Sequence, residues 1–284
     1  MAEEAMKILH VCNHFHPCIG GMEKYVQGVC KGLAERGHRN DVACLDRCAH
    51  SNNCLPSRGR LAKTQIYRLP FVDLRFYKIC PSVLRLVKGY DIINVHGIGF
   101  FSDFLILTSL LHRKKIILTT HGGVFHTSRG QRLKSLYFNL VQHLLLRHCK
   151  AIIAVSRNDM RIFGRPANLS LIQEGIDYGK FATLRNSGNA LLYIGRLAAN
   201  KRLDRLIQAF SVMCRILPEA KLFIAGPGQE DLVRRLKAVT AQNGLQRHVF
   251  FCGSVSEKQK LRYMRMSRFF VSASEYEGFG IALV

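Results

Sequence analysis

The sequence predicts an α/β protein made of two Rossmann-like, doubly wound domains with parallel sheets. Short apolar runs of strand length alternate with segments of helical periodicity along the whole chain, which is the pattern of repeated strand–helix–strand units. The chain has 284 residues, of which 48% are hydrophobic and 21% are charged. This length and composition allow two domains that each bury a core, and disorder is not expected.

Seven strands are expected in a first domain, residues 1–180, and four in a second domain, residues 188–284. The first seven are Lys7–Cys12, Asp41–Cys44, Gln65–Leu69, Asp91–Val95, Lys115–Thr119, Ala151–Val155 and Ser170–Ile172. The other four are Ala190–Ile194, Lys221–Ala225, His248–Phe251 and Arg268–Val271. A polar, glycine-containing stretch at 178–189 predicts the linker. No helix follows the last strand, and parallel sheets need cover on both faces, so the second domain is expected to be incomplete.

The charge of the chain predicts a polyanionic partner. Lys and Arg total 42 against 19 Asp and Glu, which gives a net charge of +23. Nucleic acid, anionic lipid and a diphosphate substrate would all be attracted by this charge. RNA binding would require aromatic residues among basic ones on one strand face, or a known module signature, and the sequence has neither. Nucleic acid is therefore not expected.

The sequence also predicts where the protein is located and whether its thiols are reduced. The N-terminus carries acids and no long apolar core, and no run reaches the length of a membrane span, so a cytoplasmic protein is expected. Most cysteines stand in apolar segments and are expected to be reduced, buried thiols. Four residues could suggest zinc, but their spacing matches no common ligand pattern, so a basic surface loop is favoured and no metal site is expected. These four residues are Cys44, Cys48, His50 and Cys54.

A glycine pair lies between the first strand and the first helix. Gly20 and Gly21 precede a helix whose apolar side chains share one face, and Gly37 ends that helix. Such a pair lets backbone N–H groups approach a phosphate at a helix N-terminus. The pair lacks the G-x-G-x-x-G pattern, so an ordinary tight turn is the alternative.

Basic residues gather where a later strand ends and a helix begins. Arg196, Lys201 and Arg202 stand in G-R-L-A-A-N-K-R. Cations are disfavoured near the positive end of a helix unless an anion is bound close by. The group therefore indicates either an anion site or a solvated basic surface.

Three further residues follow strands directly, at the edge where open α/β sheets bind ligands. His96 and His121 each precede a glycine, and Glu277 stands in a turn flanked by glycine after the last strand. A packing role is favoured for His96. Position alone does not assign His121 as a general base.

The ending S-E-Y-E-G-F-G-I-A-L-V closely resembles the signature of retaining, nucleotide-sugar-dependent glycosyltransferases of family four, which have the two-domain GT-B fold. That signature is a glutamate, seven residues and a second glutamate. If Glu277 is the first, the second would fall one position beyond Val284. The resemblance therefore implies that the chain as given lacks one glutamate of the site and is a poor enzyme.

The same resemblance covers nearly the whole chain and assigns roles to its motifs. Gly20 and Gly21 match the glycine loop that faces the donor diphosphate, and Arg196 and Lys201 match the diphosphate clamp. His121, in T-T-H-G, matches the histidine near the transferred sugar, and Glu277 would hold hydroxyls of that sugar, so these two residues are the catalytic candidates.

Two more segments resemble parts of the nucleotide site. Gly226 matches a second glycine turn, and Gly253, Ser254 and Val255 match the segment whose backbone holds the base. Ile172–Asp177 matches an interdomain element of the family, except that Glu174 replaces the usual Asn.

The activity implied is transfer of a hexose from a nucleotide diphosphate sugar to a glycan, lipid-linked or small-molecule acceptor, with retention. Charge on the leaving diphosphate would be stabilised by basic side chains and backbone N–H groups, so no metal or other cofactor is expected. The alternative is a non-catalytic fragment that binds a polyanion or a sugar nucleotide. An epimerase of the same fold fits the architecture but not the E-G-F-G ending.

An anionic membrane on its cytoplasmic face is an expected docking partner, because basic and apolar residues interleave in the region Phe71–Lys88. The segment Arg132–Lys150 has a similar composition. Its broad apolar face instead favours a core helix that packs on the sheet.

Overall fold

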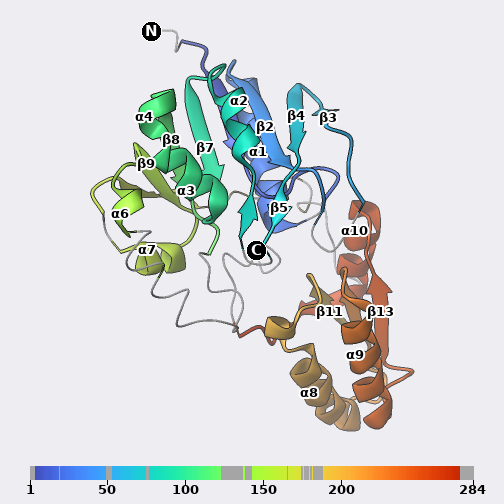
Figure 1. The fold of residues 1–284 in the computed structure, drawn as a ribbon. Helices are drawn as coiled ribbons and strands as arrows, with labels where there is room; N and C mark the ends of the chain where they lie inside the picture. The colour runs from blue at the N-terminus through green and yellow to red at the C-terminus, as the bar shows by residue number, and fades with distance from the viewer. Residues whose placement is uncertain are drawn as a thin grey trace. The chain divides into compact units, whose positions relative to one another are not determined.

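The computed structural model describes residues 4–18, 20–48, 53–74, 77–122, 137, 143–164, 166–173, 175, 179, 181 and 188–275. Contacts divide the chain into two units, Met1–Glu174 and Gly175–Val284. Each unit has its own sheet, drawn in Figure 1. The predicted α/β class with parallel sheets is confirmed, and all eleven predicted strands are present. The predicted linker begins a few residues beyond the boundary between the units.

Unit 1 contains an eight-stranded sheet in the order β10-β9-β8-β7-β1-β2-β4-β3. Its strands are β1 (Lys7–Val11), β2 (Arg39–Leu45), β3 (Arg58–Leu61), β4 (Thr64–Leu69), β7 (Ile92–His96), β8 (Lys115–Thr119), β9 (Ala151–Ala154) and β10 (Leu169–Leu171). A separate hairpin joins β5 (Val72–Asp73) to β6 (Lys78–Ile79). Every pairing in the large sheet is parallel except β3 with β4. β3 was not predicted, because R-G-R-L is a polar edge strand with no apolar run.

Unit 2 contains a four-stranded parallel sheet in the order β13-β12-β11-β14. Its strands are β11 (Ala190–Ile194), β12 (Leu222–Ala225), β13 (Val249–Gly253) and β14 (Ser267–Phe270). In both sheets the first strand lies between the second strand and a later one, which is β7 in unit 1 and β14 in unit 2. Ligands of open α/β sheets bind at the carboxyl ends of the strands, where the strand order reverses. This point lies between β1 and β7 in unit 1, and between β11 and β14 in unit 2.

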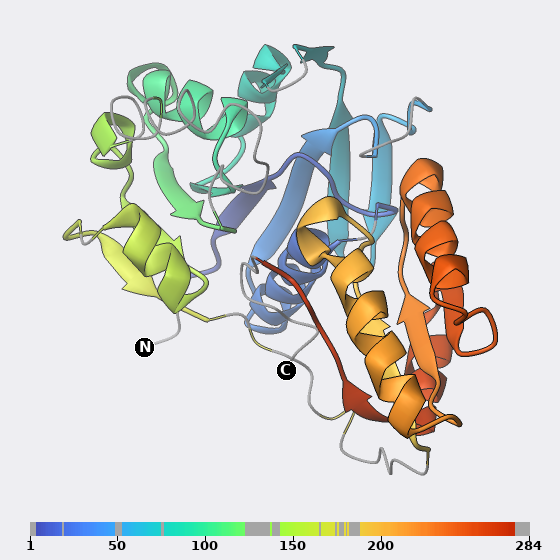
Figure 2. The same cartoon turned by 90° about the horizontal axis from the view of Figure 1, so that it is seen from below.

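Helices cover both faces of each sheet. Unit 1 contributes α1 (Gly21–Glu35), η1 (Pro81–Val83), α2 (Leu84–Val87), α3 (Phe100–Leu107), α4 (Ser109–His112), α6 (His143–Leu146) and α7 (Arg157–Phe163). Unit 2 contributes η4 (Ala199–Lys201), α8 (Leu203–Ile216), α9 (Glu230–Gln242) and α10 (Glu257–Met266). In Figure 2, α1 and α3 lie on opposite sides of the unit 1 sheet. None of the described helices has both the length and the apolar character that crossing a bilayer would require.

Side chains alternate in direction along the strands of unit 1, so one face of the sheet is apolar and the other carries both apolar and polar side chains. Leu9 and Val11 point into the large core that contains α3 and α6, whereas Val42 joins a smaller core with Val26 of α1. His10 lies between Leu9 and Val11, so its side chain points to the α1 face. Polar side chains on this face supply the candidate site described below.

The two segments compared for membrane binding both contribute to the core. Val87 is fully buried and Leu84 packs against the core, whereas Val72 and Leu74 are exposed, so membrane binding through Phe71–Lys88 stays a prediction. Arg75 and Phe76 lie outside the described residues. In the described part of Arg132–Lys150, Leu145 and Leu146 are buried, as expected for a core helix.

The expectation of reduced thiols is wrong at one pair. Cys18 and Cys48 form a disulfide with Cα atoms 5.4 Å apart. They stand in the loops after β1 and β2, which are adjacent parallel strands, and this brings the two loops together. Cys12, Cys30 and Cys149 are free and buried, as predicted, whereas Cys214 and Cys252 are half-buried.

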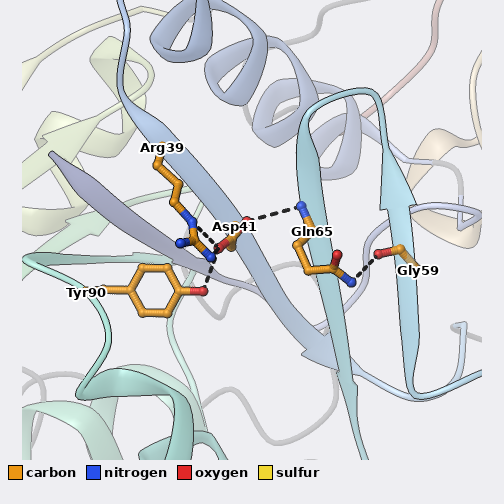
Figure 3. A network of polar contacts seen from close by, with 5 residues as sticks. All are labelled: Arg39, Asp41, Gly59, Gln65 and Tyr90. Atoms are coloured by element: carbon orange, nitrogen blue, oxygen red, sulfur yellow. Dashed lines mark hydrogen bonds and ion pairs between the residues drawn. The ribbon is translucent and has the colours of Figure 1, made fainter. Parts of the chain in front are cut away.

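A buried carboxylate fixes the amino-terminal half of the unit 1 sheet (Figure 3). Asp41 of β2 is only 2% exposed. Tyr90 donates its hydroxyl to Asp41 Oδ2 at 2.7 Å, and Arg39 donates to the same oxygen at 3.0 Å. The backbone N–H of Gln65 donates to Asp41 Oδ1 at 3.1 Å, and the Gln65 side chain donates to Gly59 O. One charge therefore joins β2 to β4 and to the turn before β7.

We expect Asp41→Ala to lower the free energy of unfolding by about 3 kcal/mol, because it removes a buried charge and leaves its donors without an acceptor. Urea denaturation would measure the loss. Asp73→Ala is the matched control, since it removes an exposed ion pair with Lys78 and should cost about 1 kcal/mol at most. Equal losses for the two variants would contradict the role given to Asp41.

Candidate functional site

In unit 1 the candidate site lies at the carboxyl ends of β1, β7 and β8. His10 belongs to β1, His96 is the last residue of β7, and His121 follows β8 by two residues. Parallel pairing of β7 with both neighbours brings the three side chains to one edge of the sheet. This edge is next to the point at which the strand order reverses.

The three histidines form one hydrogen-bonded chain. His10 Nδ1 lies 3.0 Å from His96 Nε2, and His96 Nδ1 lies 3.3 Å from His121 Nε2. At the inner end, His10 Nε2 lies 3.4 Å from Asn40 Oδ1. Tyr25 of α1 contacts the rings of His96 and His121 edge-on, with centroid distances of 6.0 and 5.0 Å.

Asn40 sets the direction of this chain. Its Nδ2 donates to the carbonyls of His38 and Cys30, so its Oδ1 is the atom that accepts from His10. His10 therefore carries its proton on Nε2 and accepts from His96 Nε2–H. By the same argument, His96 Nδ1 accepts from His121 Nε2–H. His10 and His96 consequently each have one assigned neutral tautomer, and His121 carries a proton on Nε2.

Burial keeps the inner rings uncharged. Desolvation lowers the pKa of His10 to about 4, although the bond to Asn40 opposes the shift. Burial also lowers the pKa of His96, and the neighbouring histidines His10 and His121 add to this effect. A positive charge on either inner ring is therefore disfavoured at neutral pH.

Asp159 holds the two residues that flank His121. Thr120 Oγ1 and the Gly122 N–H both donate to Asp159 Oδ2, at 2.5 and 3.2 Å. Asp159 is fully buried, and its own N–H donates to Ser156 Oγ at the start of α7. The His121 turn is therefore fixed by Asp159 through Thr120 and Gly122, and by His96 through the His121 ring.

The glycine pair lies close to this site. Gly20 is the N-cap of α1 with extended backbone, and Gly21 is the first helical residue. Met22 in the first turn approaches Gly97, where an added Cβ would lie 3.3 Å from Met22 Cε. The structure thus brings Gly20, Gly21 and His121 to the same end of the unit 1 sheet.

In unit 2 three glycines join the carboxyl ends of neighbouring strands. The Gly195 N–H donates to Ala225 O at 3.0 Å, and the Gly226 N–H donates to Gly253 O at 2.8 Å. Gly226 has a φ of 145°, and an added Cβ would lie 1.9 Å from Gly195 O. Only glycine fits this crossing of two backbones.

A cavity of about 330 Å³ opens beside these glycines. It is lined by Leu197, Ile224, Gly226, Pro227, Gly228, Val233, Lys237, Phe251, Gly253 and Ser254. Its apolar walls, glycine backbone and single lysine suit a small ligand with a flat apolar part and polar edges. Of the four predicted nucleotide-binding residues, three line the cavity and Val255 does not.

The predicted cations lie beside the cavity rather than in its wall. Arg196 is exposed directly after β11, and Tyr193 donates its hydroxyl to Arg196 O at 3.2 Å. Lys201 ends η4. Arg202 forms an ion pair with Glu275, whose N–H donates to Asn200 O at 3.0 Å. The basic turn is thereby joined to the segment that leads to Glu277, which itself lies outside the described residues.

Sequence reasoning missed His10, Asn40, Asp159 and Lys237. The first three stand inside a strand or a helix, and only their position on the α1 face or beside the His121 turn reveals them. A histidine and an asparagine at apolar strand positions were the available signal. Among the described residues, no group of three or more His, Cys, Asp or Glu is arranged to hold a metal ion.

Two family models together match almost the whole chain. The model described as Glycosyltransferase Family 4 matches residues 19–180, and the model described as Glycosyl transferases group 1 matches residues 180–284. A GDP-mannose:cellobiosyl-diphosphopolyprenol alpha-mannosyltransferase of Xanthomonas campestris is 34% identical, over 98% of this chain and 75% of the relative.

Solved structures share the fold at lower identity. Sucrose-phosphate synthase from Thermosynechococcus elongatus matches with a TM-score of 0.74 and 17% identity, over 98% of this chain and 77% of that one. HepE of Anabaena in complex with UDP and glucose matches with a TM-score of 0.70 and 18% identity, over the same shares. These likenesses confirm two Rossmann-like domains of the GT-B type.

We expect acid to destabilise the protein through the inner histidines. Between pH 6.5 and about 4, His10 binds a proton in the unfolded chain but not in the folded protein. The contribution of neutral His10 to the free energy of unfolding is therefore complete above pH 6.5 and falls by about 3 kcal/mol across this window. Urea denaturation at pH 7.5 and pH 5 should show a smaller pH dependence for His10→Gln than for the wild type.

Thr119→Val is the control for this measurement. Thr119 is buried and donates to Asn94 Oδ1 on the neighbouring strand, but it does not titrate. This variant should lose the same stability at both pH values. An unchanged pH dependence in His10→Gln would show that His10 takes up a proton as readily in the folded protein as in the unfolded chain.

Proposed function

The chain belongs to the glycosyltransferases of family 4, and on that premise we propose that it transfers mannose from GDP-mannose to a lipid-linked saccharide with retention at the anomeric carbon. The relative from Xanthomonas campestris, whose printed name specifies a GDP-mannose donor and a diphosphopolyprenol acceptor, supports both substrates. A relative of the same name from Komagataeibacter xylinus is 32% identical over 99% of this chain and adds to that support.

The observation that carries the donor half of the proposal is the glycine-lined cavity of unit 2. The base would enter between Phe251 and the Gly226 turn, and backbone groups of Gly253 and Ser254 would contact its polar edge. Arg196 and Lys201 follow β11 on the same side of the sheet. They would therefore meet the diphosphate once the base is bound.

Charge on the departing diphosphate is the main electrostatic demand of the reaction. Guanidinium and ammonium groups, together with backbone N–H groups such as those of Gly20 and Gly21, stabilise developing charge without a proton transfer. No metal is required in this proposal, because cationic side chains supply the positive charge.

In the proposal His121 contacts a hydroxyl of the donor sugar. The bond from its Nε2 to His96, and the bonds from Thr120 and Gly122 to Asp159, hold the ring in one orientation. A pre-oriented group assists the transition state without a further loss of side-chain freedom. Glu277 would hold other hydroxyls of the same sugar, as the family signature implies.

We include retention in the proposal because the chain belongs to a family of retaining enzymes. Attack from the face by which the diphosphate leaves would retain the configuration and would need no protein nucleophile. The alternative of a non-catalytic polyanion-binding protein is not favoured, since the family models cover both units.

We expect GDP to bind with chelator present, and to bind more tightly than UDP or ADP. Isothermal titration calorimetry would measure the three dissociation constants. Arg196→Ala should raise the constant for GDP roughly 10- to 100-fold, the effect of one charged hydrogen bond. Arg205→Ala, at an exposed position on α8, is the matched control. Binding that appears only with magnesium would contradict the cationic clamp.

We expect His121→Ala to lower kcat by roughly 10²-fold while the dissociation constant for GDP stays unchanged, because in the proposal His121 contacts the donor sugar, which GDP lacks. Radiolabelled GDP-mannose and a diphosphopolyprenol-linked acceptor would measure kcat. The proton NMR spectrum of the product would report the anomeric configuration. A β-linked mannose would refute retention.

A further inference from the structure

Four leucines of unit 1 stand exposed on neighbouring helices. The exposed fractions are 68% for Leu107 of α3, 85% for Leu110 and 80% for Leu111 of α4, and 60% for Leu144 of α6. α3 contacts α6, and Figure 1 shows α3, α4 and α6 on the same side of the unit. We call these four residues the leucine surface.

Hydrogen bonds at the corner between α3 and α4 keep the leucines turned outward. His112 Nε2 donates to Leu105 O at 2.8 Å, and His112 Nδ1 accepts from the Lys114 N–H at 3.1 Å. Thr108 Oγ1 donates to Phe104 O at 2.6 Å. The polar side chains of the corner thus point inward and satisfy the backbone, while Leu110 and Leu111 point to solvent.

The charged residues that directly follow α4 and α6 are basic. Arg113 and Lys115 follow α4 and are exposed, and Arg147 and Lys150 follow α6 and are exposed. The segments that follow the two helices are joined, because the Lys150 N–H donates to Ile116 O in β8. Between residues 104 and 158 the sequence contains no Asp or Glu.

We propose that the leucine surface docks the chain on an anionic lipid bilayer. Exposed leucines flanked by basic residues match the apolar interior and the negative surface of such a membrane. An acidic protein partner would also match the positive charge. Lipid headgroups are the better match, because lysines and arginines bind them without the defined geometry that a protein partner requires. The inference deepens the proposed function and draws on it, because a lipid-linked acceptor is held in a membrane.

Vesicle flotation tests the surface without any reaction. The probes are vesicles of phosphatidylglycerol and phosphatidylcholine, and vesicles of phosphatidylcholine alone, with no acceptor and no donor. The full chain should float with the anionic vesicles, bind the neutral ones at least roughly tenfold more weakly, and be released by high salt. Equal binding to both vesicles would overturn the electrostatic part of the proposal.

Variants locate the contact. Leu110→Gln with Leu111→Gln should lower the partition coefficient on anionic vesicles roughly tenfold or more. The matched control is Ile216→Gln with Leu217→Gln, an exposed apolar pair at the end of α8, which should leave the partition coefficient unchanged. Because all four side chains are exposed, circular dichroism and Tm should not change in either double variant.

Three results would overturn the leucine surface. The first is binding by the Leu110/Leu111 variant equal to that of the wild type. The second is loss of binding in Val72→Gln with Leu74→Gln, which would place the contact on the β5–β6 hairpin. The third is a wild-type dimer in sedimentation that the Leu110/Leu111 variant abolishes, which would make a second copy the occupant. Failure of GDP-mannose transfer would leave all these readouts unaffected.

Discussion

In a parallel sheet the chain must re-enter every strand at the same end, so the turns that follow the strands all lie along one edge. This constraint brings His10, His96 and His121 together although more than a hundred residues separate the first from the last. It also aligns Gly195, Gly226 and Gly253 in unit 2. The chemistry of both units is therefore positioned by strand pairing before any side chain makes a specific contact.

The interior of unit 1 has a polar row as well as an apolar core. On the α1 face, Asn40, His10 and His96 are each less than a tenth exposed, and each has a hydrogen-bond partner within the row. Buried polar groups of this kind are costly when one partner is lost, so they specify a single arrangement. Asn40 sets the donor–acceptor direction of the hydrogen bonds, and this direction extends through the rings of His10 and His96 to His121. The outermost histidine is thus oriented by an asparagine buried in the sheet.

The fold could be predicted from the sequence because apolar runs of four to seven residues mark almost every strand. The polar edge strand β3 could not, since its side chains alternate between half-buried and exposed. Motif residues such as Gly226 and Gly253 carried their own signal as glycines in turns. Asp159 gave none, and His10 gave only a histidine at an apolar strand position, because their importance depends on which neighbours the sheet places beside them. The Cys18–Cys48 pair was missed for the same reason, and the leucine surface was missed because periodicity shows which helix face is apolar but not whether another element covers it.

The backbone crossing at Gly226 has a genetic consequence. Any single-base change in a glycine codon that alters the amino acid adds a Cβ atom, and at this position that atom would lie 1.9 Å from a carbonyl oxygen. Selection should therefore hold the gene at one codon family here. At Gly28, inside α1, an added Cβ would meet nothing within 4 Å, and alanine would favour the helix. Two glycines of the same protein thus differ in their freedom to drift, and the difference follows from backbone geometry alone.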